Sequence, residues 1–505
     1  MLRSLLGVRN RGVIVTSKAT VAAKITRRHT DLRDLLEHID QIGELQRLEG
    51  VDWNLEMGAL SEMVCQESRE GKSPALLFDN VPGFPAGFRV LSGATNSTRR
   101  LAYALGFAEP ERAIDLVRAF RDRMRTDFEL TPPVEVKHGP IFENIDRDDD
   151  VDLYKFPVPF LHELDGGRYI GTDDMVTIRD PESAWVNSAT YRVMVHNRNT
   201  CGIWMSPGKH GRIIREQYFA RGKPCPVAIS VGQDPLLFMA ANQEIDFGID
   251  ELAYAGGHRG APFEIVKSEL YGLPIPAHAE VVLEGEIYGD ETLPEGPFGE
   301  FMGYYASGVS DEPIVKVRRV YYRHDPILCL ASPARPPNNF SYARSIVKSA
   351  MIWDEVEKAG LPGVTGVWCH EAGASRLFNV ISIKQMYPGH AKQAAMLAAT
   401  CHAGNYAGRW TIVVDDDIDP ASLFDVIWAL STRSDPPKDV DFIRRAWSTP
   451  LDTMLIGPPY ENNRGIIDAC RPWDRLETFP TVAEASPELK RQMREKYRKL
   501  FDTLA

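Results

Sequence analysis

Residues 295–300 read Glu-Gly-Pro-Phe-Gly-Glu and are followed by Phe-Met-Gly-Tyr-Tyr at 301–305. Pro297 and the two glycines exclude a regular helix here, because proline lacks a backbone donor and glycine is a poor helix former. The stretch is therefore predicted to be a loop that holds Glu295 and Glu300 beside apolar side chains. Partial burial and like-charge proximity both raise a carboxyl pKa toward neutrality, which makes such a group a usable proton donor. The alternative is a solvated acidic turn.

The chain has 505 residues, 44% of them hydrophobic and 25% charged, which is typical of an ordinary globular protein. This length allows about two to four domains with substantial cores. A formal net charge of -12 and the lack of a long Lys/Arg run argue against a nucleic-acid partner, so we expect a small-molecule partner. Apolar stretches fall short of the roughly 20 residues that cross a bilayer, so no membrane partner is expected.

The cysteines and the amino-terminal arm indicate the cellular compartment in which the protein is expected. The seven cysteines are scattered and never form a Cys-X-X-Cys pair, which favours reduced thiols in a reducing compartment. Residues 1–30 contain seven Lys or Arg and no acidic residue before Asp31, a composition typical of a mitochondrial transit peptide. A disordered arm or a start codon placed too early are the alternatives. We expect a cytoplasmic protein, or a mitochondrial one if residues 1–30 are a targeting segment.

Residues 31–130 alternate helical and strand-like patterns. Apolar residues recur at helical spacing between Leu32 and Ile42, and a Pro/Gly turn separates two short apolar runs that indicate strands. This alternation predicts an amino-terminal α/β domain. The expected helices lie at 32–42, 54–67 and 109–124, and the expected strands at 76–78 and 88–91.

Residues 131–325 consist of short β-rich runs separated by Gly, Pro, Asn and Asp. Runs this short and this regularly interrupted favour a barrel or sandwich over a doubly wound sheet. The expected strands include 175–178, 191–195, 227–231, 281–287 and 314–317.

Three polar elements fall inside this β-rich segment, at 187–192, 206–210 and 250–251. They supply an amide oxygen, an imidazole and a carboxylate, a suitable ligand set for Mn²⁺ or Mg²⁺ whose shell a phosphate could complete. The spacing alone is weak evidence for a metal site, because any β-domain contains Asn, His and Glu, and ordinary structural roles for these residues are more common.

Residues 326–505 return to α/β alternation. A helix is expected at 342–359, because Gly360 and Pro362 form a good carboxy-terminal signal. Strands are expected at 366–369, 378–383 and 410–414, and a helix at 420–432. A last helix opens at Ser486 and carries an apolar stripe, which needs a partner surface in its own subunit or in another. The stripe consists of Leu489, Met493, Tyr497, Leu500 and Leu504.

Together these segments resemble the UbiD family of decarboxylases, which use prenylated FMN. The resemblance covers nearly the whole chain from about residue 31 to 480 and is carried by 73–78, 165–167, 187–192, 207–210, Glu251, 281–286, 295–300 and 416–419. It implies an α/β fold of three domains: an amino-terminal α/β domain (31–130), a central split β-barrel that binds the flavin (131–325), and a carboxy-terminal α/β domain with a terminal helix (326–505). The last domain is expected to contribute to a homo-oligomer, a dimer or a hexamer.

The resemblance implies a cofactor site. Asn187, His210 and Glu251 match the family's divalent-metal ligands, which tie Mn²⁺ to the cofactor phosphate, with K⁺ close by. Lys392 is similar to a phosphate-contacting lysine. The other residues expected at the cofactor are Thr190, Tyr191, Arg192 and Lys209. Many relatives have Gln where this chain has Lys209, which adds a cation near the cofactor or the substrate carboxylate and puts the substrate class in doubt.

The resemblance also implies a catalytic network of Arg192, Glu295 and Glu300. A guanidinium can hold one carboxylate ionised and oriented while the other carries a proton. Arg192 would orient the substrate carboxylate, Glu300 would return a proton to the carbon that lost CO₂, and Glu295 would hold Arg192 in place.

The expected activity is that of a carboxy-lyase: non-oxidative, reversible decarboxylation of an aromatic, heteroaromatic or α,β-unsaturated acid. The flavin would accept the electron density that no ordinary side chain can take, and a flavin prenyltransferase would supply it. Two alternatives are a two-carboxylate glycosidase, which needs no flavin, and a non-enzymatic flavin- or metal-binding assembly factor. The sequence does not name the acid.

Overall fold

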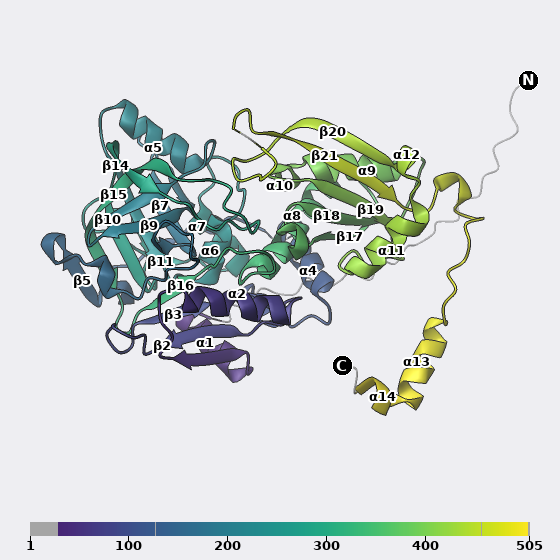
Figure 1. Ribbon diagram of the computed structural model, residues 1–505, viewed down its shortest axis with the longest axis horizontal. Coiled ribbons are helices and arrows are strands. Elements are labelled where there is room, and N and C mark those ends of the chain that lie inside the picture. Colours follow the sequence, from purple (N-terminus) through teal and green to yellow (C-terminus); the bar gives the residue numbers. More distant parts are fainter. Residues whose placement is uncertain (1–28, 127, 456, 503–505) are drawn as a thin grey trace, which may run out of the picture.

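The computed structural model describes residues 29–126, 128–455 and 457–502, which form three packed regions and a projecting tail (Figure 1). Most of the segment 1–30, where a targeting signal is expected, lies outside the described residues. The same holds for Leu504, the last residue of the expected apolar stripe.

The amino-terminal region is a four-stranded sheet in the order β1-β2-β3-β16, with helices packed on it. Asp31 caps the first helix, because its side chain accepts hydrogen bonds from the backbone N–H groups of Arg33 and Asp34. The apolar stripe of this helix is buried against the sheet, as its spacing predicts. The elements are α1 (Leu32–Gln41), β1 (Leu45–Glu49), α2 (Glu56–Ser68), β2 (Ala75–Asp79), β3 (Arg89–Ser92), α3 (Thr98–Ala104), α4 (Ala113–Thr126) and β16 (Ile327–Leu330).

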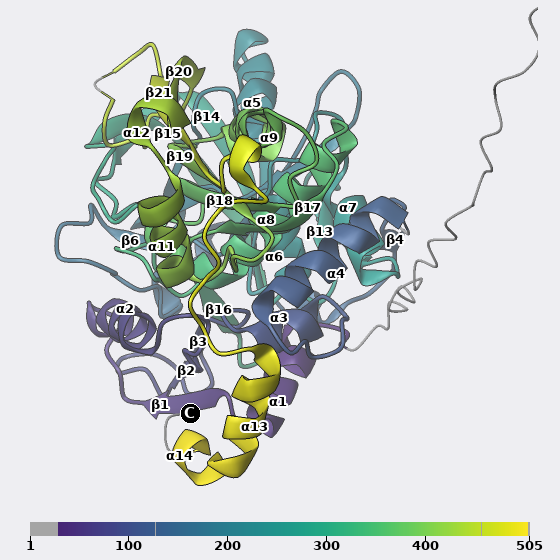
Figure 2. The same cartoon turned by 90° about the vertical axis from the view of Figure 1, so that its right-hand side faces the viewer.

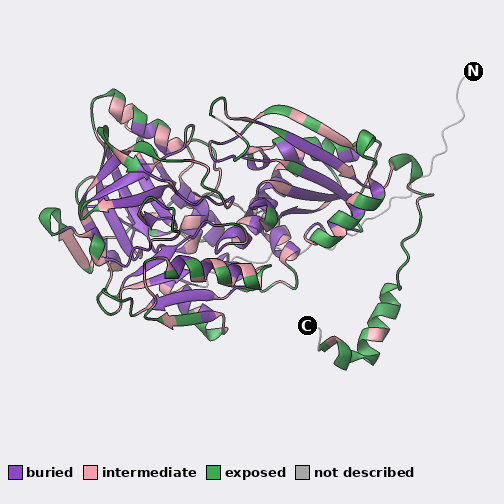
Figure 3. Ribbon diagram, viewed as in Figure 1, coloured by how far each residue is buried: buried purple, intermediate pink, exposed green. Residues whose placement is uncertain are grey.

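The central region is a nine-stranded sheet in the order β6-β9-β10-β15-β14-β11-β7-β8, with β5 paired to β15. Every pairing in it is antiparallel. Its strands are mostly buried (Figure 3), and buried aliphatic and aromatic residues form its core. The strands are β5 (Asn144–Arg147), β6 (Arg168–Gly171), β7 (Asp174–Arg179), β8 (Val186–Ala189), β9 (Arg192–Asn197), β10 (Thr200–Trp204), β11 (Cys225–Val231), β14 (Val281–Glu295) and β15 (Ser310–Tyr322). The β-rich character predicted from the sequence is confirmed.

Three helices pack beside β7 and β8, the last two strands in the order of this sheet. α5 (His210–Ala220) and α6 (Pro235–Ala241) contact both β7 and β8, and α7 (Glu251–Arg259) contacts β8. A small three-stranded sheet lies beside them, made of β4 (Val134–Glu135), β12 (Glu264–Lys267) and β13 (Pro274–Pro276). Short 3₁₀ turns occur at Pro140–Phe142, Asp148–Asp150, Leu153–Lys155, Glu371–Gly373 and Trp473–Arg475.

The carboxy-terminal region is a mixed five-stranded sheet in the order β17-β18-β19-β21-β20. Its long helix α8 (Ser341–Lys358) ends before Gly360, which has φ +91, as the glycine signal predicts. Several predicted boundaries differ by a few residues. For example, the helix expected from residue 420 begins at Leu423, because the Ser422 side chain caps it. The elements are β17 (Val364–Cys369), β18 (Phe378–Ile383), α9 (His390–Thr400), α10 (His402–Asn405), β19 (Trp410–Asp415), α11 (Leu423–Arg433), α12 (Pro436–Asp439), β20 (Val440–Trp447) and β21 (Glu461–Ala469).

The tail ends in α13 (Pro487–Lys496) and α14 (Arg498–Asp502), which stand away from the body in Figure 1 and overlap the amino-terminal region in the perpendicular view of Figure 2. Neither helix contains a buried residue, and Leu489 and Tyr497 are exposed. Among the described residues of the predicted apolar stripe, Leu489, Tyr497 and Leu500 are thus exposed to solvent, and Met493 is half-buried. In the residues that the structure describes, every helix is too short or too polar to cross a lipid bilayer.

Candidate active site

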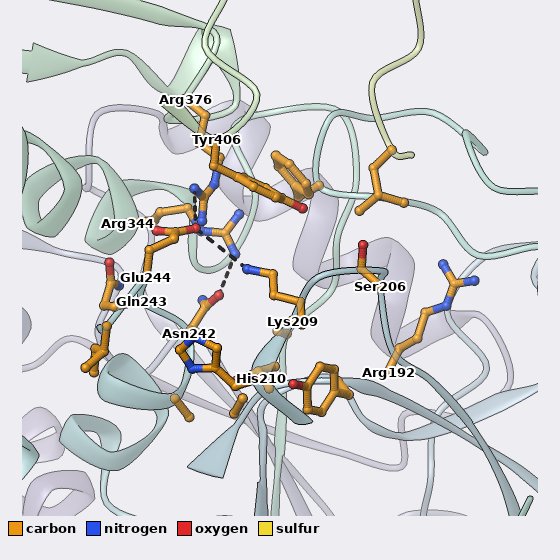
Figure 4. Close-up of a pocket in the computed structure, with 18 of the residues that line it drawn as sticks. Arg192, Ser206, Lys209, His210, Asn242, Gln243, Glu244, Arg344, Arg376 and Tyr406 are labelled. Carbon is orange, nitrogen blue, oxygen red and sulfur yellow. Dashed lines mark hydrogen bonds and ion pairs between the residues drawn. The ribbon is translucent and has the colours of Figure 1, made fainter. Parts of the chain in front are cut away.

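A cavity of about 400 Å³ lies between the central region and the carboxy-terminal region (Figure 4). Its central-region wall includes Asn187, Arg192 and Glu300, and its carboxy-terminal wall includes Arg376 and Tyr406. The volume is in the range of small-molecule sites.

The loop at 295–300 is buried at one side of this cavity. Glu295 is 0% exposed and Glu300 is 6% exposed, so the alternative of a solvated acidic turn is wrong. Apolar neighbours bury the loop as expected, since Phe298, Phe301 and Met302 are all buried.

The Asp-Gly-Gly stretch at 165–167 holds this loop. The backbone N–H of Gly166 donates to the carbonyl of Pro297 at 2.7 Å, and Asp165 Oδ1 accepts from the N–H of Gly299 at 3.0 Å. A side-chain carbon at Gly166 would lie 2.0 Å from the carbonyl oxygen of Gly296, so only glycine permits this approach. The stretch therefore fixes where the two glutamates sit.

Arg192, the first residue of β9, lies between the two glutamates. Its Nε and Nη2 donate to the two carboxylate oxygens of Glu295 at 2.8 Å and 2.6 Å, and its Nη1 donates to Glu300 Oε1. Tyr169 donates its hydroxyl to Glu295 at 3.0 Å. The structure thus brings together the three residues that the resemblance named as catalytic.

The two carboxylates differ in their surroundings. Glu300 lines the cavity with Arg192, whereas Glu295 is not among the cavity-lining residues of the described chain. Burial raises the pKa of Glu300 above its ordinary 4.5, although Arg192 opposes this. Burial would lower the pKa of Arg192, but the nearby Glu300 and Glu295 outweigh it and raise that pKa. The arrangement is therefore a fixed cation with one positioning carboxylate and one carboxyl suited to carry a proton.

The three candidate metal ligands line the same cavity because α5 and α7 pack against β8. Asn187 lies in β8, and His210 and Glu251 are the first residues of α5 and α7. Asn187 Nδ2 donates to Glu251 Oε1 at 2.7 Å, and the N–H of Ser188 donates to Glu251 Oε2 at 2.8 Å. All three candidate ligands line the cavity.

These residues fit a divalent cation. Asn187 Oδ1 is buried and has no hydrogen-bond partner, and burial raises the pKa of Glu251 to about 8. Burial and the neighbouring Lys209 lower the pKa of His210, which favours the neutral imidazole that binds metals. Both an orphaned amide oxygen and a desolvated carboxylate gain from a bound cation. No group of three or more His, Cys, Asp or Glu side chains in the described ranges could hold a metal, so the site depends on the amide of Asn187.

The other predicted cofactor residues divide into two groups. Thr190, Tyr191 and Lys209 line the cavity, and the Tyr191 hydroxyl accepts from the N–H of Gly211 at 3.0 Å, which supports the start of α5. Lys392 does not line the cavity: it lies on α9 and pairs with Asp441 of β20. The structure therefore does not bring Lys392 to this cavity, because α9 packs on the carboxy-terminal sheet and this residue pairs with β20.

Sequence reasoning missed a polar group in the cavity wall, formed by Glu244 of the central region and by Arg344 and Arg376 of the carboxy-terminal region. Arg376 Nη1 donates to Glu244 Oε1 at 2.8 Å across 132 residues of sequence. Only the packing of one region on another creates this group, so no local motif could reveal it.

Comparison with known proteins identifies the family. Three family models match in order: the amino-terminal domain of 3-octaprenyl-4-hydroxybenzoate carboxy-lyase at residues 36–120, its Rift-related domain at 133–336 and its carboxy-terminal domain at 341–469. A pyrrole-2-carboxylic acid decarboxylase of Pseudomonas aeruginosa is 36% identical over 425 residues, which is 81% of this chain and 84% of that protein.

Solved structures agree in fold. Vanillic acid decarboxylase of Sedimentibacter hydroxybenzoicus, in an open form, superposes with a TM-score of 0.81 at 30% identity, covering 94% of this chain and 99% of that one. The UbiD-class enzyme HmfF of Pelotomaculum thermopropionicum, in complex with FMN, has a TM-score of 0.80 at 27% identity, covering 92% and 100%. An evolved dimeric form of HmfF was solved with prFMN.

The expected fold class and enzyme class are confirmed by these matches, which favour a carboxy-lyase over a two-carboxylate glycosidase. The site agrees, because Arg192 occupies the space between the two carboxylates where a glycosidase would need its sugar. The chain is a decarboxylase and belongs to the UbiD family.

Proposed function

We propose that this protein decarboxylates an aromatic, heteroaromatic or α,β-unsaturated acid, non-oxidatively and reversibly, with prenylated FMN as cofactor. The observation that carries the proposal is the buried Glu295–Arg192–Glu300 network at the wall of a cavity of about 400 Å³. Relatives that act on pyrrole-2-carboxylic acid and vanillic acid support an aromatic or heteroaromatic substrate.

In this proposal Arg192 binds the substrate carboxylate. Four of its five N–H donors have partners among the described residues, three on the glutamates and one on Ser307 Oγ at 2.9 Å. One Nη2 hydrogen is left for the substrate. Because Glu295 accepts from both Nε and Nη2, the guanidinium plane is fixed before the substrate arrives, which reduces the ordering cost of binding.

In this proposal Glu300 donates the proton to the product. The bond between the ring carbon and the carboxylate breaks, CO₂ leaves, and the electron pair stays with the carbon; the bound flavin supplies the electron sink for this step. Glu300 then gives its proton to that carbon, which forms the C–H bond and leaves a carboxylate paired with Arg192. In the reverse direction the Glu300 carboxylate removes the same proton.

We propose that Asn187, His210 and Glu251 hold Mn²⁺, which joins the protein to the flavin phosphate, with K⁺ nearby. The orphaned Asn187 oxygen and the raised pKa of Glu251 support the cation. Thr190, Tyr191 and Lys209 would contact the flavin from the cavity wall.

The test is to purify the full-length protein with and without a co-expressed flavin prenyltransferase. Both preparations should be folded, as judged by circular dichroism, and only the first should release CO₂ from a panel of aromatic and heteroaromatic acids. Full-rate decarboxylation by protein that carries only unmodified FMN would overturn the cofactor proposal. No CO₂ release from any acid by prenylated, Mn²⁺-loaded protein would overturn the activity.

We further propose a homo-oligomer, a dimer or hexamer. Two apolar surfaces support it: the tail helix α13, and the outer face of α11, where Phe424 is 82% exposed beside exposed Ile427 and Trp428. Light scattering should give an oligomer for the full chain and a smaller species after deletion of residues 477–505. An unchanged mass after deletion would exclude the tail from the interface.

For location, we propose the cytoplasm, or the mitochondrion if residues 1–30 act as a targeting segment. A fluorescent protein fused to residues 1–30 separates the two, because only a targeting segment carries it into mitochondria.

A further inference from the structure

One wall of the cavity carries more positive than negative charge. We call it the cationic wall and define it as the lining residues Lys209, Arg344 and Arg376 around the single carboxylate of Glu244, which also pairs with Lys348 outside the lining. Lys348 donates to Glu244 Oε2, Arg376 donates to Glu244 Oε1 at 2.8 Å, and Lys209 Nζ lies 4.0 Å from the same Oε1. Three cations, Lys209, Lys348 and Arg376, therefore share one acid.

Arg344 makes no ion pair in the part of the chain that the structure describes. Its polar contact is a long hydrogen bond of 3.5 Å to Asn242 Oδ1, its guanidinium lies 4.5 Å from the ring of Phe340, and its Nε is buried without a partner. Burial and the neighbouring Arg376 lower the pKa of Arg344 to about 9. A desolvated cation in this state gains strongly from an anion.

The other acids of the cavity have their own partners. Its acidic lining residues are Glu244, Glu251 and Glu300. Glu300 pairs with Arg192, and Glu251 accepts a hydrogen bond from Asn187 and belongs to the proposed metal ligands. The cationic wall is thus left with a surplus that no cavity acid neutralises.

The cationic wall faces the same space as the reacting groups. Lys209, Arg344 and Arg376 gather on one side of the view, and Arg192 lies on the other (Figure 4). Arg344 lies 5.2 Å from the ring of Phe301, the residue directly after Glu300. A ligand that spans the cavity can therefore meet a cation at each end.

We propose that the substrate is an aromatic or heteroaromatic acid with a second anionic group, in its simplest form a dicarboxylate. Arg192 receives the carboxylate that is lost, and Lys209 and Arg344 receive the second one. This inference rests on the proposed decarboxylase function and adds the substrate class to it. The alternative occupant of the cationic wall is the flavin phosphate, which the test below separates.

The experiment measures binding by isothermal titration with full-length protein that carries Mn²⁺ and unmodified FMN, so that turnover does not interfere. The paired ligands are furan-2-carboxylate with furan-2,5-dicarboxylate, and benzoate with benzene-1,3-dicarboxylate. Wild-type protein should bind at least one diacid about tenfold or more tightly than its monoacid, with a preference that shrinks as salt rises. Equal affinity for the diacid and the monoacid in both pairs would overturn the inference.

Substitutions in the cationic wall test which residues cause the preference for diacids. Arg344→Gln should cut the diacid-to-monoacid ratio about tenfold, and Lys209→Gln, whose side chain is 36% exposed and so tolerates change, should cut it as well. Arg445→Gln is the matched control, because this exposed arginine pairs with Glu461 away from the cavity and should leave the ratio unchanged. If both cavity variants weaken FMN binding and leave the ratio intact, the cationic wall serves the cofactor and the inference fails.

Failure of the inference and failure of the proposed function are distinguishable. Prenylated enzyme that releases CO₂ from monoacids but shows no diacid preference would overturn the substrate class alone. Diacid binding that depends on Arg344, with no CO₂ release from any acid, would overturn the function and keep the binding site.

Discussion

Two parallel hydrogen bonds join Arg192 to Glu295, from Nε to Oε1 at 2.8 Å and from Nη2 to Oε2 at 2.6 Å. This fork uses both oxygens of a fully buried carboxylate, so Glu295 positions the guanidinium and has no free oxygen for the substrate. Glu300, on the other side of Arg192, is left to carry the proton.

Arg192→Lys should keep the charge and lose the fork, because an ammonium cannot donate two parallel hydrogen bonds to one carboxylate. We expect decarboxylation to fall by about 10² or more, the order that a small misplacement of a reacting group costs. Flavin and metal content, measured by absorbance and mass spectrometry, should stay at wild-type levels. Turnover within about threefold of wild type would show that the fork does not matter.

His210→Ala should lower Mn²⁺ and flavin content together, because one cation is expected to link the protein to the cofactor phosphate. His138, on a loop outside the cavity, provides the control: His138→Ala should retain both. Full flavin occupancy in a metal-free His210→Ala protein would count against the metal site.

Glu244→Gln should destabilise the fold, since it removes the carboxylate that Lys348 and Arg376 share in a buried setting. Loss of one partner from a buried pair costs about 3–5 kcal/mol. Urea denaturation would measure the free energy of unfolding, with Glu461→Gln at an exposed pair as a control expected to leave the curve in place. If the cationic wall binds diacids, a diacid should restore part of the lost stability. Equal stability of the Gln variant and the wild type would contradict the surplus of positive charge.

The pH dependence of proton delivery should follow Glu300. Burial raises its pKa above the ordinary 4.5, so the neutral donor survives to a higher pH than it would on the surface. Decarboxylation should therefore fall as pH rises through this raised pKa. The free energy of unfolding should depend on pH in the same direction. The stabilisation from this carboxyl is present below about pH 4.5, which is its pKa in the unfolded chain, and is lost as the pH rises through its higher pKa in the folded protein. A pH profile of turnover at saturating substrate tests this, and a rate that climbs through the same range would contradict it.

Much of the fold was predictable from local pattern. The helical stripe after Asp31, the Gly360 stop and the short β-rich runs all act within a few residues, and the structure has the corresponding helices and strands. The order of the nine strands was not predictable, because non-consecutive strands such as β7 and β11 pair across about 50 residues of intervening chain.

The candidate site divides in the same way. Phe298 and Phe301 beside two glutamates already indicated a buried acidic loop, and the structure confirms its burial. The cationic wall was not predictable, since Lys209 and Arg344 meet only where two regions pack. Lys392 shows the limit of a local motif: the match gives a residue type, and the packing of α9 decides which way it points.

The central claim is that Glu300 carries the proton, and Glu300→Gln in the prenylated holoenzyme tests it most directly. The amide is nearly isosteric, so flavin and Mn²⁺ content should stay normal, while turnover and solvent-deuterium incorporation into the product should both fall by about 10² or more. Glu291→Gln, the same change at an exposed position of β14, should leave both rates unchanged. Near-normal turnover and deuterium incorporation in Glu300→Gln, with the flavin intact, would contradict the assignment.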